Sequence, residues 1–316
     1  MGGKLVDGNW VTKETWESDD SGSFKRQESV FRNQVERAET GRYHLYISHA
    51  CPWAHRTLMT RTLLGLESVF TYSNVHPLML DDGWQFEPED TRFPSVDPIY
   101  ARRYLRDVYL HADPNYTGRV TVPILWDRQS DTIVNNESAE IIRMMAVDFA
   151  PLGTTGLELY PAALRPAIDD AMQRFYSPIN NGVYRCGFAR SEAAYTAAHN
   201  ELFAALDEWN DVLADRPFLC GDALTLADIA LFPTLIRFDP VYYVHFKTSK
   251  KHVYEYPHLW SFVRRMYALP GVAQTVHFDQ IKTHYFASHR QLNPRGFVPD
   301  GPDMDALLTS DTGPDA

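Results

Sequence analysis

Cysteine is scarce in this chain of 316 residues, which contains only Cys51, Cys186 and Cys220. An odd and sparse count does not suit a disulfide-stapled scaffold and fits a reducing compartment, so we expect a cytoplasmic protein. The chain has no run near the roughly 20 apolar residues that a membrane helix needs. Its first residues also lack the apolar segment of a signal peptide. We therefore expect no membrane partner.

Basic residues are outnumbered, because 30 Lys and Arg face 41 Asp and Glu and leave a formal net charge of -11. Sequence-independent binding of nucleic acid needs a basic footprint, so the sequence predicts no nucleic-acid partner. The hydrophobic share of 44% and the charged share of 22% are ordinary for a globular protein. The length is sufficient for a large core and two domains.

What the sequence does contain is a cysteine at a predicted strand-to-helix turn. A β-type run over residues 43–48 leads to Cys51, and a helical pattern follows with Pro52 at its first position. Proline suits that position because its missing N–H would be unpaired there. The unpaired N–H groups of a first helical turn favour a thiolate, so we expect Cys51 to be nucleophilic. Three neighbours can add positive potential: His49, His55 and Arg56.

Two other interpretations of Cys51 remain open. The first is a buried, inert cysteine. The second is a zinc site made of His49, Cys51 and His55, although this spacing matches no common pattern and no second Cys-x-x-Cys motif exists. The flanking strand and proline favour the reactive thiol, and we expect no metal. Ala54 occupies the place of a resolving cysteine, so an external thiol must resolve any disulfide formed at Cys51.

The remaining pattern divides the chain into four parts. Residues 1–40 are polar with scattered aromatic rings and predict an N-terminal arm. Residues 41–150 predict βαβ, a long loop and ββα, which is an α/β unit with a mixed sheet. After a linker, residues 160–299 are helical, and residues 300–316 are rich in Asp, Pro and Gly and predict a disordered tail.

Two features of the α/β unit suit a peptide-like ligand. A proline inside a strand belongs at an edge or a special turn, and a cis Val122–Pro123 bond would leave the backbone of Val122 open to an extended peptide. Glu137 and Ser138 open the next helix. They either cap it or hold an α-amino and an α-carboxylate group.

The Cys-Pro-x-Ala turn, the Val-Pro strand and the Glu-Ser helix start resemble the thioredoxin-like domain of glutathione transferases. The helical half, with Thr-Leu-Ala-Asp at 225–228, resembles their C-terminal domain. Within that superfamily, the sequence most resembles the glutathionyl-hydroquinone reductases, the xi class. The stretches that carry this resemblance are 51–56, 83–84, 118–123, 136–143 and 180–184. The resemblance implies an α/β thioredoxin-like domain, an all-α glutathione-transferase C-terminal domain and a homodimer.

The family implies an activity, the reductive removal of glutathione from S-glutathionyl hydroquinones, with glutathione as co-substrate. Cys51 would attack the glutathione sulfur of the conjugate, the hydroquinone would leave, and a second glutathione would resolve the mixed disulfide. By resemblance, glutathione is held by Trp84, Arg119, Val122, Glu137 and Ser138. An ordinary surface role for Arg119 remains open.

Three tyrosines match those that line the aromatic-substrate pocket of the family: Tyr184, Tyr242 and Tyr285. Tyr184 and Tyr285 are catalytic candidates, because a phenol can donate the proton that the leaving carbon must gain. Packing in the core is the alternative for each, since the chain has 17 tyrosines.

Three other functions remain to be weighed. A conjugating transferase needs a Ser or Tyr where this chain has Cys51, so the cysteine argues against it. A dehydroascorbate reductase or a general deglutathionylating thiol transferase also uses Cys-Pro-x-Ala, but the stretches 53–56 and 118–123 favour the reductase. A non-enzymatic interaction protein would not need the complete set of glutathione contacts.

Overall fold

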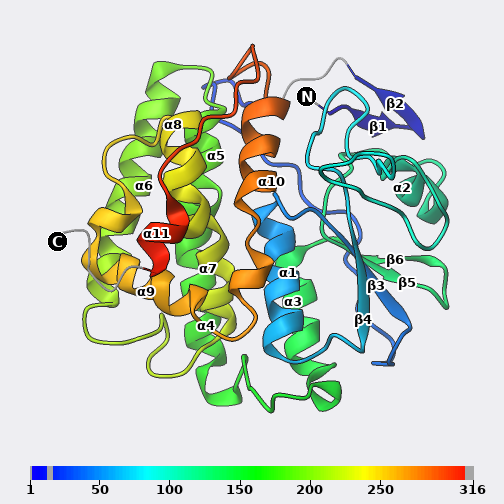
Figure 1. The fold of residues 1–316 in the computed structure, drawn as a ribbon, viewed down its shortest axis with the longest axis horizontal. Coiled ribbons are helices and arrows are strands. Elements are labelled where there is room, and N and C mark those ends of the chain that lie inside the picture. Colours follow the sequence, from blue (N-terminus) through cyan, green and yellow to red (C-terminus); the bar gives the residue numbers. More distant parts are fainter. Residues whose placement is uncertain (1, 13–16, 310–316) are drawn as a thin grey trace. The chain divides into compact units, whose positions relative to one another are not determined.

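The computed structural model describes residues 2–12 and 17–309 (Figure 1). These residues form two compact units. The first unit contains residues 2–12, 27–157 and 275–297, and the second contains residues 17–26, 158–274 and 298–309.

A four-stranded mixed sheet is the centre of the first unit. Its strand order is β4-β3-β5-β6, with β3 and β4 parallel and the other neighbouring pairs antiparallel. The strands are β3 (Tyr43–Ile47), β4 (Phe70–Asn74), β5 (Ile124–Asp127) and β6 (Thr132–Asn135). All five residues of β3 are buried, as expected of a strand covered on both faces.

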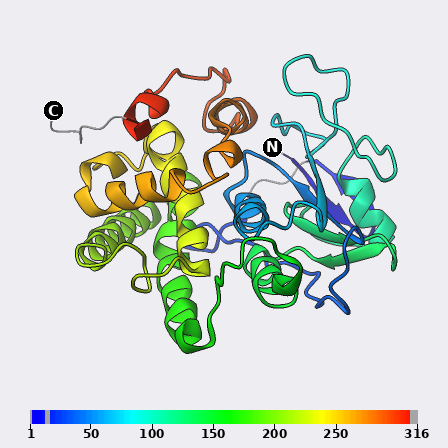
Figure 2. The ribbon, with the colours of Figure 1, turned by 60° about the horizontal axis from the view of Figure 1, so that its bottom comes forward.

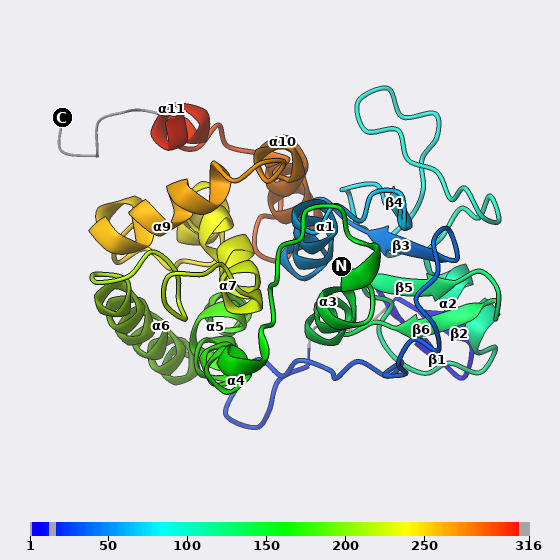
Figure 3. The ribbon, with the colours of Figure 1, turned by 90° about the horizontal axis from the view of Figure 1, so that it is seen from below.

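Helices cover both faces of this sheet (Figure 3). Helix α1 (Pro52–Leu63) makes the crossover that the parallel pair requires, and it packs against α3 (Ser138–Val147) on one face. Helix α2 (Arg106–Ala112) lies on the other face, in contact with β6. A short 3-10 turn, Ala150–Leu152, follows α3. This is the βαβ, loop and ββα order that the sequence predicts.

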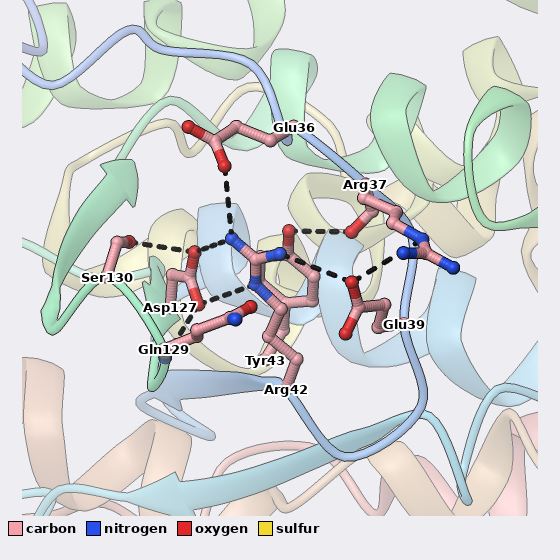
Figure 4. Close-up of polar contacts among 8 residues, drawn as sticks. All are labelled: Glu36, Arg37, Glu39, Arg42, Tyr43, Asp127, Gln129 and Ser130. Carbon is pink, nitrogen blue, oxygen red and sulfur yellow. Dashed lines mark hydrogen bonds and ion pairs between the residues drawn. The ribbon is translucent and has the colours of Figure 1, made fainter.

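A buried ion pair ties the start of β3 to the β5–β6 turn (Figure 4). Arg42 donates from Nε to Oδ1 of Asp127 at 2.8 Å and from Nη2 to Oδ2 at 2.5 Å. The amide of Gln129 and the hydroxyl of Ser130 donate to the same carboxylate. Burial alone would raise the pKa of Asp127, but the hydrogen bonds from Arg42, Gln129 and Ser130 outweigh it and lower the pKa to about 2.

The N-terminal residues divide between the two units, whereas the sequence predicts one arm over 1–40. Strands β1 (Lys4–Val6) and β2 (Asn9–Val11) form a hairpin in the first unit. Leu5 exchanges two backbone hydrogen bonds of 2.9 Å with Gly118. These bonds anchor the hairpin to the rest of the first unit. Residues 17–26 belong to the second unit.

Residues 275–297 belong to the first unit, although the sequence groups 160–299 as helical. They contain α10 (Phe278–Lys282) and a π-helix, Thr283–Ser288. Asn74 donates to the side chain of Gln280 at 3.0 Å, and the amide of Met79 donates to Ser288 at 2.9 Å. These partners lie more than 200 positions apart in the chain, so local periodicity does not show them.

The second unit is helical, and its helices, coloured green to orange in Figure 2 with the last one in red, pack against one another. Helix α7 is buried over all 12 of its residues. It begins at a capping box of Thr225 and Asp228, which the sequence predicts. The α-helices of this unit are α4 (Arg165–Phe175), α5 (Gly182–Gly187), α6 (Glu192–Val212), α7 (Leu226–Arg237), α8 (Tyr243–His245), α9 (Pro257–Tyr267) and α11 (Met304–Thr309).

Shorter helices connect these elements. The π-helices are Tyr176–Asn180 and Phe238–Tyr242. The 3-10 helices are Ala162–Leu164, Val253–Glu255 and Ala273–Thr275. Among the residues that the structure describes, no helix has both the length and the apolar character that crossing a membrane requires.

The C-terminal stretch contains a helix where the sequence predicts a disordered tail. Met304 and Leu308 of α11 are buried, and Arg264 donates to the carbonyl of Leu308 at 3.3 Å. Two apolar residues at helical spacing therefore outweigh the disorder that the local composition predicts. The rest of the predicted tail, residues 310–316, lies outside the described residues.

Candidate functional site

Cys51 lies in the turn between β3 and α1, where the sequence predicts it. It is the N-cap residue of α1, with φ -78° and ψ 123°, and Pro52 is the first helical residue. Its amide donates to the carbonyl of Ser48 and its carbonyl accepts from the amide of His55, both at 3.0 Å. The residue is half-buried. The sulfur therefore lies at a helix N-terminus, where the first N–H groups favour negative charge.

The sulfur of Cys51 meets the backbone that precedes β5. Its thiol donates to the carbonyl oxygen of Val122, with 3.5 Å between sulfur and oxygen. Val122 is 5% exposed, and the Val122–Pro123 bond is cis. An extended peptide that paired with the backbone of Val122 would thus have its own side chains within reach of Cys51.

The start of α3 holds the next two predicted residues. Glu137 is the N-cap, and its Oε1 accepts from the amide of Ala139 at 3.2 Å. Its Oε2 accepts from the hydroxyl of Ser29 at 3.1 Å. Ser138 is buried, and its hydroxyl accepts from Nη1 of Arg56 at 3.3 Å. Capping and ligand binding are compatible, because an ionised carboxylate has about four acceptor sites.

A buried tyrosine joins α3 to the loop before β5. The hydroxyl of Tyr109 donates to the carbonyl of Thr121 at 2.9 Å and accepts from Nδ2 of Asn136 at 3.0 Å. Burial raises the pKa of Tyr109, so the phenol stays neutral and keeps its proton for this bond. Thr121 precedes Val122 and Asn136 precedes Glu137. Tyr109 therefore links the two stretches that hold predicted glutathione contacts.

Arg119 is half-buried, and its backbone is held on both sides. Its amide donates to Oε1 of Gln27 at 3.1 Å, and its carbonyl accepts from the hydroxyl of Tyr116 at 3.1 Å. The preceding Gly118 has φ +155°, and a Cβ there would lie 2.7 Å from the side chains of Gln27 and Tyr116. Only glycine fits this position without a shift of its neighbours.

Trp84 and Tyr285 lie in one aromatic cluster of the first unit. The ring of Trp84 stacks on His284, with 4.7 Å between ring centroids and 21° between planes. The ring of Tyr285 meets His284 and His289 edge to face, at 5.2 Å and 5.5 Å. Nδ1 of His284 lies 2.9 Å from the carbonyl of Pro77, which makes Nδ1 the protonated nitrogen.

The other two predicted tyrosines lie in the second unit. The rings of Tyr184 and Tyr242 are 6.1 Å apart, and the ring of Phe246 is 5.3 Å from both. The guanidinium of Arg26 lies 4.6 Å above the ring of Tyr184, and its Nε donates to Asn181 at 2.7 Å. The structure thus brings Tyr184 and Tyr242 together. It groups Tyr285 with Trp84 in the other unit.

The side chains proposed for a zinc site point to other partners. The ring of His49 lies 3.9 Å from that of His277, and Nε2 of His55 lies 2.8 Å from the hydroxyl of Thr275. Within residues 2–12 and 17–309, no group of three His, Cys, Asp or Glu side chains is arranged to hold a metal ion.

The chain matches known proteins over nearly its whole length. Residues 50–147 match the family model described as glutathione S-transferase, N-terminal domain, and residues 192–265 match the model of the C-terminal domain. The chain is 47% identical to the glutathionyl-hydroquinone reductase YqjG of Escherichia coli, over 96% of each chain. It is 46% identical to the glutathionyl-hydroquinone reductase PcpF of Sphingobium chlorophenolicum, over 95% of this chain and 96% of that one.

The chain belongs to the glutathionyl-hydroquinone reductases, the xi class of glutathione transferases.

Solved structures of this family agree with the fold. An xi-class transferase from Natrialba magadii superimposes with a TM-score of 0.92 at 47% identity, covering 98% of this chain and 95% of that chain. The glutathione-bound structure of YqjG gives a TM-score of 0.85 at 46% identity, covering 96% and 97%. The predicted fold class, an α/β thioredoxin-like domain followed by an all-α glutathione-transferase domain, is confirmed.

Several residues of this xi-class chain were missed by sequence reasoning. Tyr109 and Gln27 act through contacts across the fold, so no local motif marks them. Tyr242 and Tyr285, which the sequence does predict as site residues, both lie in π-helical segments that it does not predict. Such segments are rare and recur at functional sites, but the helical periodicity of a sequence does not distinguish them from α-helix.

Proposed function

We propose that this chain reduces S-glutathionyl hydroquinones to hydroquinones with glutathione, through a mixed disulfide between Cys51 and glutathione. The observation that carries the proposal is the sulfur of Cys51 at the N-terminus of α1, 3.5 Å from the carbonyl of Val122. The names of the relatives YqjG and PcpF support this reaction.

In the first step the thiolate of Cys51 attacks the sulfur of the conjugate. A sulfur–sulfur bond forms and the bond from sulfur to the ring carbon breaks. The electron pair of the broken bond goes to the ring carbon, which takes a proton, so the aromatic product leaves as hydroquinone. The two sulfurs are oxidised to a disulfide and the ring carbon is reduced.

In the second step a glutathione thiolate attacks the glutathione sulfur of the mixed disulfide. Oxidised glutathione leaves and the thiolate of Cys51 returns. Ala54 one helical turn further on cannot resolve the disulfide, which supports an external thiol in this role. The sum is one conjugate and one glutathione converted to one hydroquinone and one oxidised glutathione.

In this proposal, glutathione is held by residues at the start of α3 and by residues in and near the stretch before β5. The carboxylate of Glu137 meets the γ-glutamyl ammonium, and Ser138 with the first N–H groups of α3 receives the α-carboxylate. The backbone of Val122 pairs with the cysteinyl residue. Arg119 pairs with a carboxylate and Trp84 contributes packing. The positions of Glu137 and Ser138 at the start of α3 support these roles.

The proton for the ring carbon comes from a tyrosine phenol, with Tyr285 and Tyr184 as candidates and Tyr242 as a wall of the aromatic pocket. Tyr285 lies in the unit that contains Cys51, and it is 1% exposed. A buried phenol next to aromatic rings suits a planar substrate. We further propose a cytoplasmic homodimer that acts on a small glutathionyl aromatic substrate, as the family and the scarcity of cysteine support.

Product analysis tests the reaction. Purified protein is incubated with a synthetic S-glutathionyl hydroquinone and excess glutathione, and free hydroquinone and oxidised glutathione are quantified. Equal release of both, lost in Cys51→Ser, is the expected result. No release from the conjugate, with turnover of dehydroascorbate or of a glutathionylated protein instead, would overturn the substrate while keeping the thiol chemistry.

A further inference from the structure

Residues 27–33, which we call the strap, run along the start of α3 in the first unit. The amide of Asn136 donates to the carbonyl of Phe31 at 3.0 Å, and the amide of Phe31 donates to Oδ1 of Asn136 at 3.1 Å. The amide of Asn33 donates to the carbonyl of Val134 at 3.0 Å. The strap is therefore hydrogen-bonded along the stretch of chain that ends at Glu137.

Ser29 of the strap contacts the carboxylate of Glu137. Its hydroxyl lies 3.1 Å from Oε2 of Glu137 and 3.2 Å from the carbonyl of Asn136, so its one proton is shared between two acceptors. The other oxygen, Oε1, accepts from the amide of Ala139 at 3.2 Å. Each carboxylate oxygen thus has a donor, and together the donors fix the direction of the side chain.

Gln27 of the strap holds the backbone of Arg119. Its Oε1 accepts from the amide of Arg119 at 3.1 Å, and its Nε2 would lie 2.7 Å from a Cβ at Gly118. The strap therefore contacts two predicted glutathione-binding residues. Gln27 holds Arg119, which is predicted to bind a carboxylate, and Ser29 holds Glu137, which is predicted to bind the ammonium group.

Other residues anchor the strap independently of Gln27 and Ser29. The ring of Phe31 stacks on Tyr116 at 5.6 Å and meets Tyr109 edge to face at 5.8 Å. Arg32 donates from Nε to Oε2 of Glu140 at 2.8 Å and forms a second bond from Nη2 to the other oxygen. The strap therefore stays in place when the side chain of Gln27 or Ser29 is removed.

We propose that the strap is a positioning element of the glutathione site, with Ser29 holding Glu137 for the γ-glutamyl ammonium and Gln27 holding the backbone of Arg119 for a carboxylate. This rests on the proposed function, because it takes the ligand to be a γ-glutamyl thiol. A carboxylate that is already aimed at its ligand loses less side-chain entropy when it binds. The strap thus raises affinity without contacting the reacting atoms.

The test is calorimetric binding of S-methylglutathione, which has no thiol to react, to the full chain. We expect Ser29→Ala to weaken binding about threefold to tenfold, the effect of one lost hydrogen bond. Ser29→Thr keeps the hydroxyl and should bind like wild type. Gln27→Ala should weaken binding to a similar degree. In turnover assays both alanine variants should raise KM for glutathione and leave kcat unchanged.

Ser130→Ala is the matched control. Its hydroxyl donates to the carboxylate of Asp127 at 2.8 Å in the same unit, so the substitution removes a similar bond at a different place. The affinity of the Ser130→Ala variant for S-methylglutathione should equal that of wild type. A loss of affinity in Ser130→Ala as large as that in Ser29→Ala would assign the effect to general stability and overturn the proposal.

A double-mutant cycle decides whether Ser29 acts through Glu137. In the background of Glu137→Gln, which lacks the charge, Ser29→Ala should weaken binding no further. Additive effects, or wild-type affinity in Ser29→Ala, would overturn the proposal, as would wild-type protein that does not bind S-methylglutathione. Binding with the expected cycle but no hydroquinone release would instead overturn the proposed reaction and leave the strap supported.

Discussion

The thiol of Cys51 donates to the carbonyl oxygen of Val122 across 3.5 Å. The proposed nucleophile therefore lies beside the one stretch of backbone that the sequence singles out for pairing with a peptide. A γ-glutamyl peptide bound along Val122 would bring its sulfur to the sulfur of Cys51. The proposed chemistry is therefore at sulfur rather than at a carbonyl or phosphate, and the first and third predictions below depend on it.

The first prediction concerns Cys51. Cys51→Ser should abolish turnover and keep binding of S-methylglutathione, because the hydroxyl is a poor nucleophile toward sulfur but nearly the same size. Cys186→Ser is the control, since burial raises the pKa of that thiol to about 12 and keeps it protonated. Steady-state assays check both, and substantial activity in Cys51→Ser would contradict the mechanism.

The second prediction concerns the hydroxyl of Tyr109. Tyr109→Phe leaves Asn136 and the backbone of Thr121 without this partner, which should cost about 1–3 kcal/mol of unfolding free energy and weaken binding of S-methylglutathione. Tyr43→Phe removes a similar bond of 2.8 Å, to the carbonyl of Arg37, in the same unit. It should cost stability alone, measured by urea unfolding. Unchanged affinity in Tyr109→Phe would show that the hydroxyl of Tyr109 does not contribute to ligand binding.

The third prediction concerns the proton donor. A general acid contributes about 100-fold to 10,000-fold in rate, so Tyr285→Phe should lower the single-turnover rate of hydroquinone release more than it lowers the stability of the fold. Tyr104→Phe removes a phenol hydroxyl from a half-buried tyrosine of the same unit and should leave the rate unaltered. Tyr184→Phe is measured in parallel. If Tyr285→Phe releases hydroquinone at the wild-type rate and Tyr184→Phe does not, the assignment moves to Tyr184.

The fourth prediction concerns stability in acid. The pKa of Asp127 is about 2 when folded and about 3.9 when unfolded, so the unfolded chain binds more protons between these values. The contribution of Asp127 to the free energy of unfolding is complete above about pH 4, and it is lost as the pH falls toward about 2. Asp127→Asn should therefore lose less stability than wild type between neutral pH and about pH 3.

The same variant should also be less stable at neutral pH, by about 3 kcal/mol, because Arg42 then lacks its buried ionic partner. Asp222→Asn, at an exposed position, is the control and should follow wild type at every pH. Urea unfolding across this range is the measurement. A constant difference between wild type and Asp127→Asn would show that Asp127 is not the group that titrates.

Local signals were sufficient for the parts of the site that lie at helix starts. The turn at Cys51 follows from a strand, a proline and a helical pattern that are adjacent in sequence. The N-cap at Glu137 likewise follows from neighbouring residues. Proline and capping preferences act over one helical turn, so a sequence shows them directly.

Contacts between distant segments could not be predicted. Ser29 reaches Glu137 over 108 positions and Gln27 reaches Arg119 over 92. Assignment of residues 275–297 to the first unit likewise depends on partners such as Asn74, 206 positions from Gln280. A polar side chain in an irregular segment carries no periodicity, so only the folded chain reveals what it holds.

The most direct test of the central claim is to trap the intermediate. The protein is mixed with a stoichiometric amount of S-glutathionyl hydroquinone in the absence of free glutathione, quenched in acid and mapped by mass spectrometry. The account predicts one glutathione in disulfide linkage at Cys51 for each hydroquinone released, removed when glutathione is then added. Release of hydroquinone without an adduct at Cys51, or with the adduct at Cys186 or Cys220, would contradict it.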